Sequence, residues 1–377
     1  MGESGSKLNV AVLVTEYRYN SHADVILGRL LGDFAYRPRV EVVSMYTDQV
    51  PDGDMSREAA ARCGIPVCPS IAEAIRADHS GGPVDGVIII AEHGNYPKNE
   101  KGQILYPRRR FLEETLAALD ELGRAVPIFS DKHLAYTYSD SLWMYDEMKA
   151  RGIPFMGGSS IPYADLVPAL DLGRAGSMKE ILVISNGGLE CYGFHAMEVL
   201  QSIAEFREGG ETGVRSVELI RGGQGEVWEA MDRGEWPEDL LLHALSVYPD
   251  LPQVHPRTSE PDPAMYRIEY ADGTKAFIIQ FKRLHEHWAF AFRDREGRIA
   301  ASRYDNDLDR PFSHFERLTR AIETFFLTRR PPQPPERTLL TSGMISFAME
   351  SLFAGKKLET PELMIKYTAL PVVEGEE

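Results

Sequence analysis

Cysteine is scarce in this sequence, and no apolar run is long enough to cross a bilayer. The 377 residues contain 3 cysteines: Cys63, Cys68 and Cys191. Their odd number and their spacing match neither a disulfide framework nor a zinc site, which indicates reduced thiols in a cytoplasmic protein. Because no stretch approaches about eighteen apolar residues, we expect no membrane span. The short polar start also lacks the apolar core of a signal peptide.

Basic residues are in the minority. Lysine and arginine total 41 against 57 acidic residues, and the formal net charge is −16. Nucleic acids and anionic membranes both favour a basic face, so we expect neither as a partner. The sequence is 43% hydrophobic, which is ample for a core. Its length predicts two domains.

The first 155 residues alternate short apolar runs with segments of helical spacing. Such apolar runs are typical of strands that are buried on both faces. With short connections, this alternation predicts a parallel, doubly wound sheet with right-handed crossovers. We therefore expect a Rossmann-like domain at 1–155. Its clearest expected strands are 8–14, 40–46, 84–90 and 126–130, and its clearest expected helices are 22–31, 111–122 and 140–150.

From about residue 177 the pattern changes to longer strands in which polar and apolar residues alternate. This alternation predicts a mostly antiparallel open sheet with helix 193–206 on one face. Residues 223–248 are expected to form a helical insertion. The fold class is therefore α/β, with a second, α+β domain for substrate and assembly at 156–377. The last expected helix, 339–355, could pack back on the first domain.

Asp131, Lys132 and His133 directly follow the expected strand 126–130. In open α/β sheets, ligands bind at the carboxyl ends of the strands. There Lys132 could hydrogen-bond or protonate a substrate oxygen, and His133 could act as an acid, a base or a metal ligand. The alternative is a polar strand end followed by a helix cap.

Several stretches, in their order and spacing, resemble the Gfo/Idh/MocA oxidoreductases. They include VPIFSDKHLAYT (126–137), GFHAMEVLQ (193–201), YADGTKAF (270–277) and GMISFAMESLFAGK (343–356). The resemblance implies an NAD- or NADP-binding first domain and a sugar, cyclitol or related polyhydroxylated substrate. It implies catalytic roles for Lys132, which would polarise the substrate oxygen, and for His195, which would act as acid or base. It also implies a homo-dimer or homo-tetramer formed through the C-terminal sheet.

The loop after the first strand departs from that family. Residues 15–21 contain no glycine, whereas the family carries G-x-G-x-x-G there. Those glycines let backbone N–H groups approach a pyrophosphate. In this sequence the cofactor contacts would fall to Thr15, Arg18, Asp48 and His93. Asp48 lies one position beyond the expected ribose-binding acid.

Four histidines follow expected strands or begin expected helices. They are His22, His93, His133 and His195, and Glu190 accompanies the last of them. Neutral imidazoles with a carboxylate suit Zn, Mn or Fe. The alternative function is therefore a nucleotide-independent, metal-assisted enzyme that uses these histidines in the former cofactor crevice as a lyase, a hydrolase, an isomerase or a catalyst of metal-dependent oxidation. The same side chains could instead move protons, Glu190 could orient His195, and His22 could only pack.

Overall fold

The computed structural model describes residues 7–76, 82–174, 176–248, 251, 255–282, 284 and 287–370. The chain divides into two compact units. The first comprises Met1–Gly158 and Asp309–Thr338, and the second comprises Ser159–Leu308 and Leu339–Glu377. Each unit combines helices with a sheet, which confirms the α/β class. The first unit thus includes a late segment, while the domain boundary at 155/156 stays a prediction.

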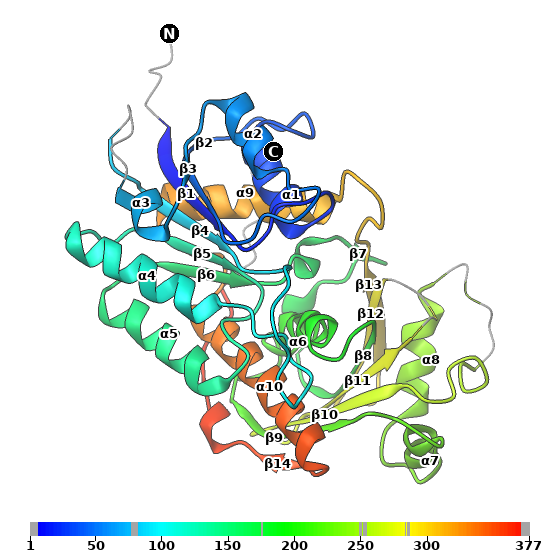
Figure 1. Ribbon diagram of the computed structural model, residues 1–377. Helices are drawn as coiled ribbons and strands as arrows, with labels where there is room; N and C mark the ends of the chain where they lie inside the picture. The colour runs from blue at the N-terminus through cyan, green and yellow to red at the C-terminus, as the bar shows by residue number, and fades with distance from the viewer. Residues whose placement is uncertain are drawn as a thin grey trace. The chain divides into compact units, whose positions relative to one another are not determined.

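The first unit is built on a six-stranded sheet in the order β3-β2-β1-β4-β5-β6 (Figure 1). Every neighbouring pair is parallel, as the apolar runs predict. The chain reverses direction across the sheet between β1 and β4, so this is the switch point of a Rossmann-like fold. The strands are β1 (Leu8–Val14), β2 (Val40–Thr47), β3 (Val67–Cys68), β4 (Gly86–Ile90), β5 (Ile128–Asp131) and β6 (Phe155–Gly158).

Among the described residues of the first unit, six helices accompany this sheet. The hydroxyl of Ser21 caps the first of them by accepting from Asp24 N–H. The last one, α9, packs against α1, and its Phe326 lies over Gly86, where an added Cβ would come within 3.1 Å of the ring. The helices are α1 (His22–Leu30), α2 (Ser56–Cys63), α3 (Ile71–Arg76), α4 (Arg108–Glu121), α5 (Tyr138–Ala150) and α9 (Ser313–Thr328).

The second unit contains an eight-stranded sheet in the order β14-β9-β10-β11-β8-β12-β13-β7. Only the pair β8 and β11 is parallel, so the sheet is mostly antiparallel, as predicted. Its strands are β7 (Leu166–Val167), β8 (Met178–Asn186), β9 (Val214–Ile220), β10 (Ala264–Tyr270), β11 (Lys275–Phe281), β12 (Trp288–Asp294), β13 (Ile299–Tyr304) and β14 (Leu358–Glu359).

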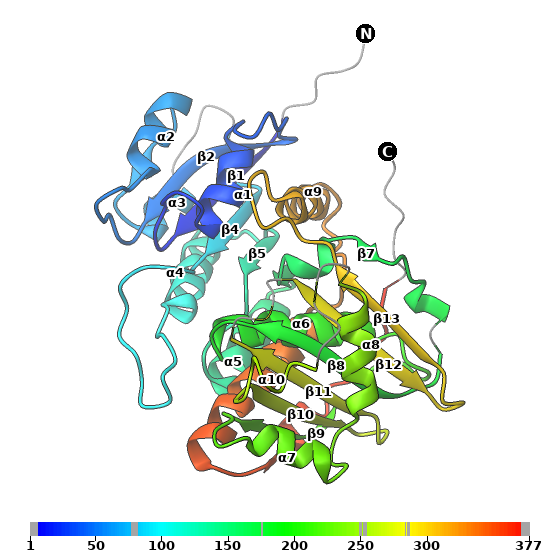
Figure 2. The same ribbon diagram turned by 90° about the vertical axis from the view of Figure 1, so that its right-hand side faces the viewer.

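Helices cover both faces of this second sheet (Figures 1 and 2). Helix α6 (Cys191–Ala204) packs on β8, β11 and β12. On the other face lie α7 (Glu226–Asp232) and α8 (Glu238–Ser246). Trp228 of α7 and Trp236, between the two helices, are buried in one core cluster with Ile184 and Ile279. The helical insertion expected at 223–248 therefore packs its buried side chains against the second sheet and forms a hydrophobic core with it.

Helix α10 (Pro335–Ala354) belongs to the second unit from Leu339 onward. There its Thr341 hydroxyl donates to Glu198 of α6 across 2.6 Å. Three short 3-10 turns complete the fold at η1 (Ile161–Tyr163), η2 (Leu172–Arg174) and η3 (Pro361–Leu363). Within the described parts of the chain, no helix has the length and apolarity that a membrane span requires.

Candidate functional site

Four buried polar side chains meet where β4 and β5 end. Glu92 follows β4, Lys132 and His133 follow β5, and Arg108 is the first residue of α4; together we call them the Glu92 cluster. Arg108 Nη2 lies 2.5 Å from Glu92 Oε2, and Lys132 Nζ lies 3.6 Å from Glu92 Oε1. Arg108 Nη1 lies 3.1 Å from His133 Nε2. Each of the four residues is at most 3% exposed.

The cluster holds more positive than negative charge. Burial alone would raise the pKa of Glu92, but Lys132 and Arg108 lower it well below its ordinary value, so this carboxyl is ionised. Burial and then Arg108 lower the pKa of His133, so the imidazole is neutral. Two cations then face one carboxylate. An excess of positive charge in a buried setting can stabilise negative charge that develops on a substrate oxygen.

The backbone turns sharply after both strands. Lys132 has φ 68° and His93 has φ 71°, both in the left-handed region that side chains disfavour. The backbone N–H of Lys132 donates to the carbonyl of Gly158 across 3.0 Å, which anchors its turn to β6. Unfavourable backbone at strand ends is a recurring property of functional sites. Lys132 and His93 share this backbone conformation with other described residues, among them Asn20 and Arg329, so it supports a functional role only together with their buried contacts.

Two further pairs cross the same edge of the sheet. His22 Nδ1 lies 2.7 Å from Asp131 Oδ2, and Arg18 Nη2 lies 3.2 Å from His93 Nδ1. The rings of His22 and His93 meet edge to face with their centroids 5.6 Å apart. Burial and then His22 lower the pKa of His93 to about 3, so His93 is neutral near pH 7. The structure thus brings five predicted residues of the first unit to one edge of the sheet: His22, His93, Asp131, Lys132 and His133.

The residues predicted to contact a cofactor are engaged with the protein itself. The Thr15 hydroxyl donates to the carbonyl of Glu92 across 2.8 Å. Asp48 accepts from the hydroxyls of Tyr46 and Tyr96, each across 2.6 Å, and from Arg110 across 2.5 Å. Burial alone would raise the pKa of Asp48, but these three partners lower it.

The start of α1 does not fit a pyrophosphate bound as in G-x-G-x-x-G loops. That mode needs a close backbone approach and free N–H groups at the helix start. Here the Ser21 hydroxyl accepts from Asp24 N–H across 3.2 Å, and the Asp24 carboxylate accepts from Asn20 N–H across 2.8 Å. Arg310 pairs with Asp24, and Arg18 pairs with Glu16. The protein's own acceptors and carboxylates therefore stand where phosphate oxygens would lie.

His195 and Glu190 belong to the second unit. His195 lies in the first turns of α6 and is 7% exposed. Its Nδ1 is 2.5 Å from the Ser159 hydroxyl, and its ring packs against Trp288 with centroids 5.7 Å apart. Ser159 thereby fixes the orientation of the imidazole. Glu190 is the half-buried residue before α6, and its suggested role of orienting His195 stays a prediction.

The side chains proposed as metal ligands do not form a ligand set in the structure. Among the described residues, no group of three or more His, Cys, Asp or Glu side chains is arranged to hold a metal ion. Within the first unit, the guanidinium of Arg108 contacts His133, and the guanidinium of Arg18 contacts His93. A cation at each imidazole opposes a second cation there. Metal binding by these side chains stays a prediction, and the geometry of the described residues does not support it.

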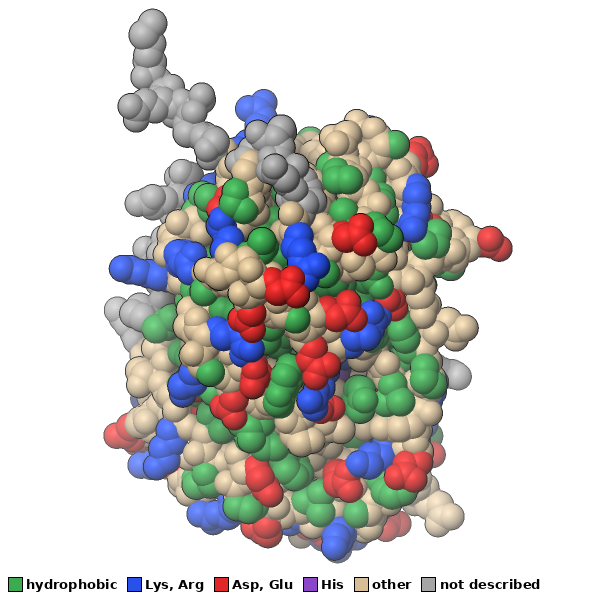
Figure 3. Space-filling model, turned by 60° about the vertical axis from the view of Figure 1, so that its left-hand side comes forward, with side chains coloured by type: hydrophobic (Ala, Val, Ile, Leu, Met, Phe, Trp, Pro, Cys, Tyr) green, Lys and Arg blue, Asp and Glu red, His purple; other side chains and the backbone are tan. Residues whose placement is uncertain are grey.

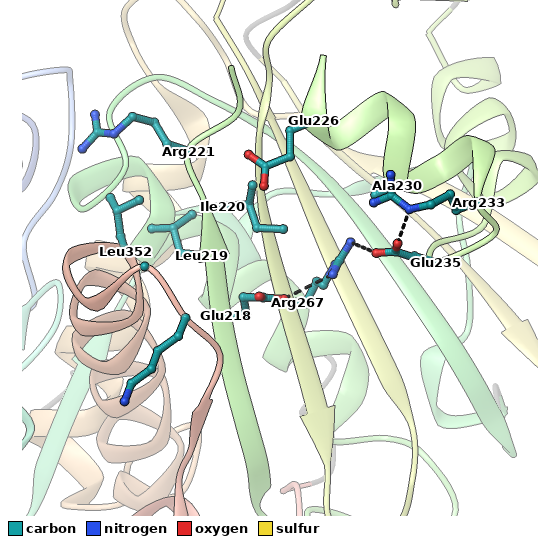
Figure 4. Close-up of a pocket in the computed structure, with 12 residues that line it drawn as sticks. Glu218, Leu219, Ile220, Arg221, Glu226, Ala230, Arg233, Glu235, Arg267 and Leu352 are labelled. Atoms are coloured by element: carbon teal, nitrogen blue, oxygen red, sulfur yellow. Dashed lines mark hydrogen bonds and ion pairs between the residues drawn. The ribbon is translucent and has the colours of Figure 1, made fainter. Parts of the chain in front are cut away.

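A separate hollow of about 270 Å³ lies in the second unit beside β9 and β10 (Figure 4). Four of its charged side chains pair with one another. Arg267 pairs with Glu235 across 2.7 Å and with Glu218 across 3.3 Å, and Arg233 pairs with Glu235 across 2.6 Å. Similarly, the face in Figure 3 intersperses acidic and basic side chains with hydrophobic ones. Neither feature offers a surface of one charge.

Sequence reasoning did not distinguish Arg108 from its two neighbours, although the structure places Arg108 in the Glu92 cluster. The run Arg108-Arg109-Arg110 is typical of a solvated helix start, and Arg109 and Arg110 do retain 41% side-chain exposure. Arg108, however, lies three and four positions before buried Phe111 and Leu112, so it shares their helix face. The spacing of Arg108 to these two apolar residues could have indicated from the sequence that Arg108 is buried.

Comparisons with known proteins support the fold. No family model matches the sequence, and no curated protein matches it significantly. GenD2 from gentamicin A biosynthesis, solved in complex with NAD, matches with a TM-score of 0.61 at 15% identity, covering 95% of this chain and 97% of that chain. A putative myo-inositol dehydrogenase from Sinorhizobium meliloti matches with a TM-score of 0.58 at 15% identity, covering 94% of this chain and 99% of that chain.

A third solved structure is an oxidoreductase from Agrobacterium radiobacter in complex with NAD+, L-tartaric acid and magnesium. It matches with a TM-score of 0.57 at 12% identity, covering 94% of this chain and 98% of that chain. The chain therefore shares the fold of these three proteins over nearly its whole length. This confirms the fold implied by the sequence resemblance.

Proposed function

We propose that this chain is an oxidoreductase of the Gfo/Idh/MocA type that acts on a sugar, a cyclitol or a related polyhydroxylated molecule. The likeness to inositol dehydrogenases over nearly the whole chain supports the reaction class. The observation that carries the proposal is Lys132, buried at the end of β5 beside Glu92 and Arg108. This is the position at which the sequence resemblance expects the catalytic lysine.

Lys132 and Arg108 provide the charge that the reaction needs. When a hydroxyl is oxidised to a carbonyl, negative charge first develops on its oxygen. The ammonium of Lys132 donates a hydrogen bond to that oxygen, and Arg108 adds positive charge nearby. Glu92 holds both cations, through the contacts of 3.6 Å and 2.5 Å, so their positions are set before substrate arrives.

His195 is the second proton-handling residue of this proposal. Its ring is oriented by Ser159 at Nδ1, and we assign the exchange of a proton with a substrate hydroxyl to Nε2. The aromatic side chains of Tyr192 and Trp288 pack around the ring. They limit its rotation and its contact with water.

NAD or NADP is the first cofactor to test, because two of the matching structures were solved with NAD. The loop 15–21 does not fit the pyrophosphate in the usual way. The charge on Lys132 and the proton exchange at His195 are properties of the chain itself and do not depend on that cofactor. A metal-assisted reaction has less support, because no three suitable side chains converge among the described residues.

The test is turnover of myo-inositol, scyllo-inositol and tartrate with NAD, NADP or a redox dye as electron acceptor. We expect the wild type to oxidise at least one polyol. Lys132→Met should lower kcat by about 100-fold or more. Lys149→Met is the matched control, because Lys149 is an exposed residue of α5. Wild-type kcat in Lys132→Met, or no oxidation with any acceptor, would contradict the proposal.

A further inference from the structure

We propose that His22 and Asp131 form an additional proton-transfer pair, in which His22 is a general base and Asp131 is its positioning residue. This inference deepens the proposed function and rests on it, because the proton would come from a hydroxyl of the same substrate. It assigns a catalytic role to a histidine whose simplest role is helix packing.

The topology places the pair across the switch point of the first sheet. His22 is the first residue of α1, which follows β1, and Asp131 is the last residue of β5. Since β4 lies between β1 and β5, the contact between these residues spans the carboxyl end of β4. That edge is where open α/β sheets bind ligands. Asp131 also directly precedes Lys132, so the positioning residue of the base and the polarising cation share one strand end.

The geometry of the pair fixes the reactive nitrogen. Asp131 is 1% exposed, and its Oδ2 accepts from His22 Nδ1 across 2.7 Å. A proton held on Nδ1 leaves the lone pair on Nε2, which makes Nε2 the basic atom. The side chain of His22 is 15% exposed, so part of the ring is accessible.

The environment suits a base that becomes transiently charged. In the transfer, the substrate O–H bond breaks, an N–H bond forms at Nε2, and Asp131 remains ionised beside the imidazolium. The carboxylate of Glu92 interacts electrostatically with His22, whereas His93 faces it as a neutral ring. Phe315 of α9 contacts the His22 ring edge to face at 5.0 Å and limits its rotation.

Reactivity toward diethyl pyrocarbonate tests the pair without any substrate. This reagent acylates the basic nitrogen of a neutral imidazole, and peptide mass spectrometry reports the rate at each histidine. We expect His22 to be acylated and Asp131→Asn to slow that acylation at least several-fold. His243 is the internal control, because it is exposed and its Nδ1 bonds only a backbone carbonyl in its own helix. Unreactive His22, or an unchanged rate in Asp131→Asn, would overturn the proposal.

Nuclear magnetic resonance of the wild type provides a second measurement that needs no variant to fold. A long-range proton–nitrogen spectrum of histidine-labelled protein should show the His22 proton on Nδ1 near neutral pH. A proton on Nε2 would overturn the proposal. Both measurements are independent of polyol turnover. A failure at His22 therefore leaves the roles of Lys132 and His195 standing. A failure of polyol oxidation with a reactive His22 overturns the proposed function and, with it, the polyol as the proton source for His22, while the ordered His22–Asp131 pair remains.

Discussion

Arg108 Nη2 lies 2.5 Å from Glu92 Oε2, and each of the two residues is at most 2% exposed. A buried ion pair of this kind is poor evidence of net stabilisation, because both charges lose their hydration. Removing one partner is strongly destabilising, since it leaves the other charge buried without compensation. Glu92 is the shared anion of two cations, so it is the position where this effect should be largest.

Glu92→Gln should therefore destabilise the protein strongly. We expect a loss of about 3–5 kcal/mol in the free energy of unfolding, measured by urea denaturation of the substrate-free protein. Glu113→Gln is the matched control, because Glu113 forms an exposed pair with Arg109 in α4 and should change stability by less than about 1 kcal/mol. Equal effects of the two substitutions would show that Glu92 does not compensate buried charge.

The neutral state of His93 predicts a loss of stability in mild acid. Burial and His22 lower its pKa in the folded protein from 6.5 to about 3. Between these values the unfolded chain binds a proton that the folded protein does not, so the free energy of unfolding falls as pH falls. One such group contributes a slope of about 1.4 kcal/mol per pH unit.

His93→Asn tests this slope, because asparagine tolerates the left-handed backbone at that position. Urea denaturation at several pH values should give a shallower fall in stability for the variant than for the wild type. The exposed His243 supplies the control, and His243→Asn should leave the slope unchanged. An unaltered slope in His93→Asn would mean that His93 is not the group that takes up the proton on unfolding.

Local patterns in the sequence were sufficient for the architecture. The runs that became β1 and β4 are continuously apolar because parallel strands are buried on both faces, and this makes them visible without any partner. Strand-end residues followed from the same reasoning, so Asp131 and Lys132 could be predicted as site candidates. Their left-handed turn and their partners could not, since these depend on neighbouring strands.

Contacts between residues far apart in the sequence could not be predicted from local sequence patterns. His22 and Asp131 are 109 positions apart and meet only because β1, β4 and β5 are neighbours in the sheet. Arg108 was hidden for another reason, since it shares its composition with two solvated arginines. Only its spacing to Phe111 and Leu112 separates it from them.

Helices α7 and α8 lead to a prediction about assembly. The sequence resemblance implies a dimer or tetramer through the C-terminal sheet, yet these helices cover the face of that sheet opposite α6. A second copy could pack against that face only by displacing buried Trp228 and Trp236. We therefore expect any dimer or tetramer that light scattering detects to use another surface, and an oligomer whose interface lies on the sheet face under α7 and α8 would contradict this expectation.

Substitutions of Lys132 can distinguish the effect of its strained backbone on stability from the effect of losing its charge on activity. Its φ of 68° favours glycine, because a Cβ in the left-handed region costs roughly 1–2 kcal/mol. Lys132→Gly and Lys132→Ala both remove the ammonium, so both should lose polyol oxidation. Lys132→Gly should nevertheless be more stable than Lys132→Ala in urea denaturation, by about 1 kcal/mol.

Lys149 is the matched position for this comparison, because it lies in the last turn of α5. In a helix, alanine is more stable than glycine by about 1 kcal/mol, so the order of the two variants should reverse there. The reversal would show that the chain holds Lys132 in an unfavourable backbone conformation to keep its ammonium beside Glu92. If alanine is the more stable residue at both positions, the turn after β5 is not strained, and the placement of Lys132 carries no conformational cost.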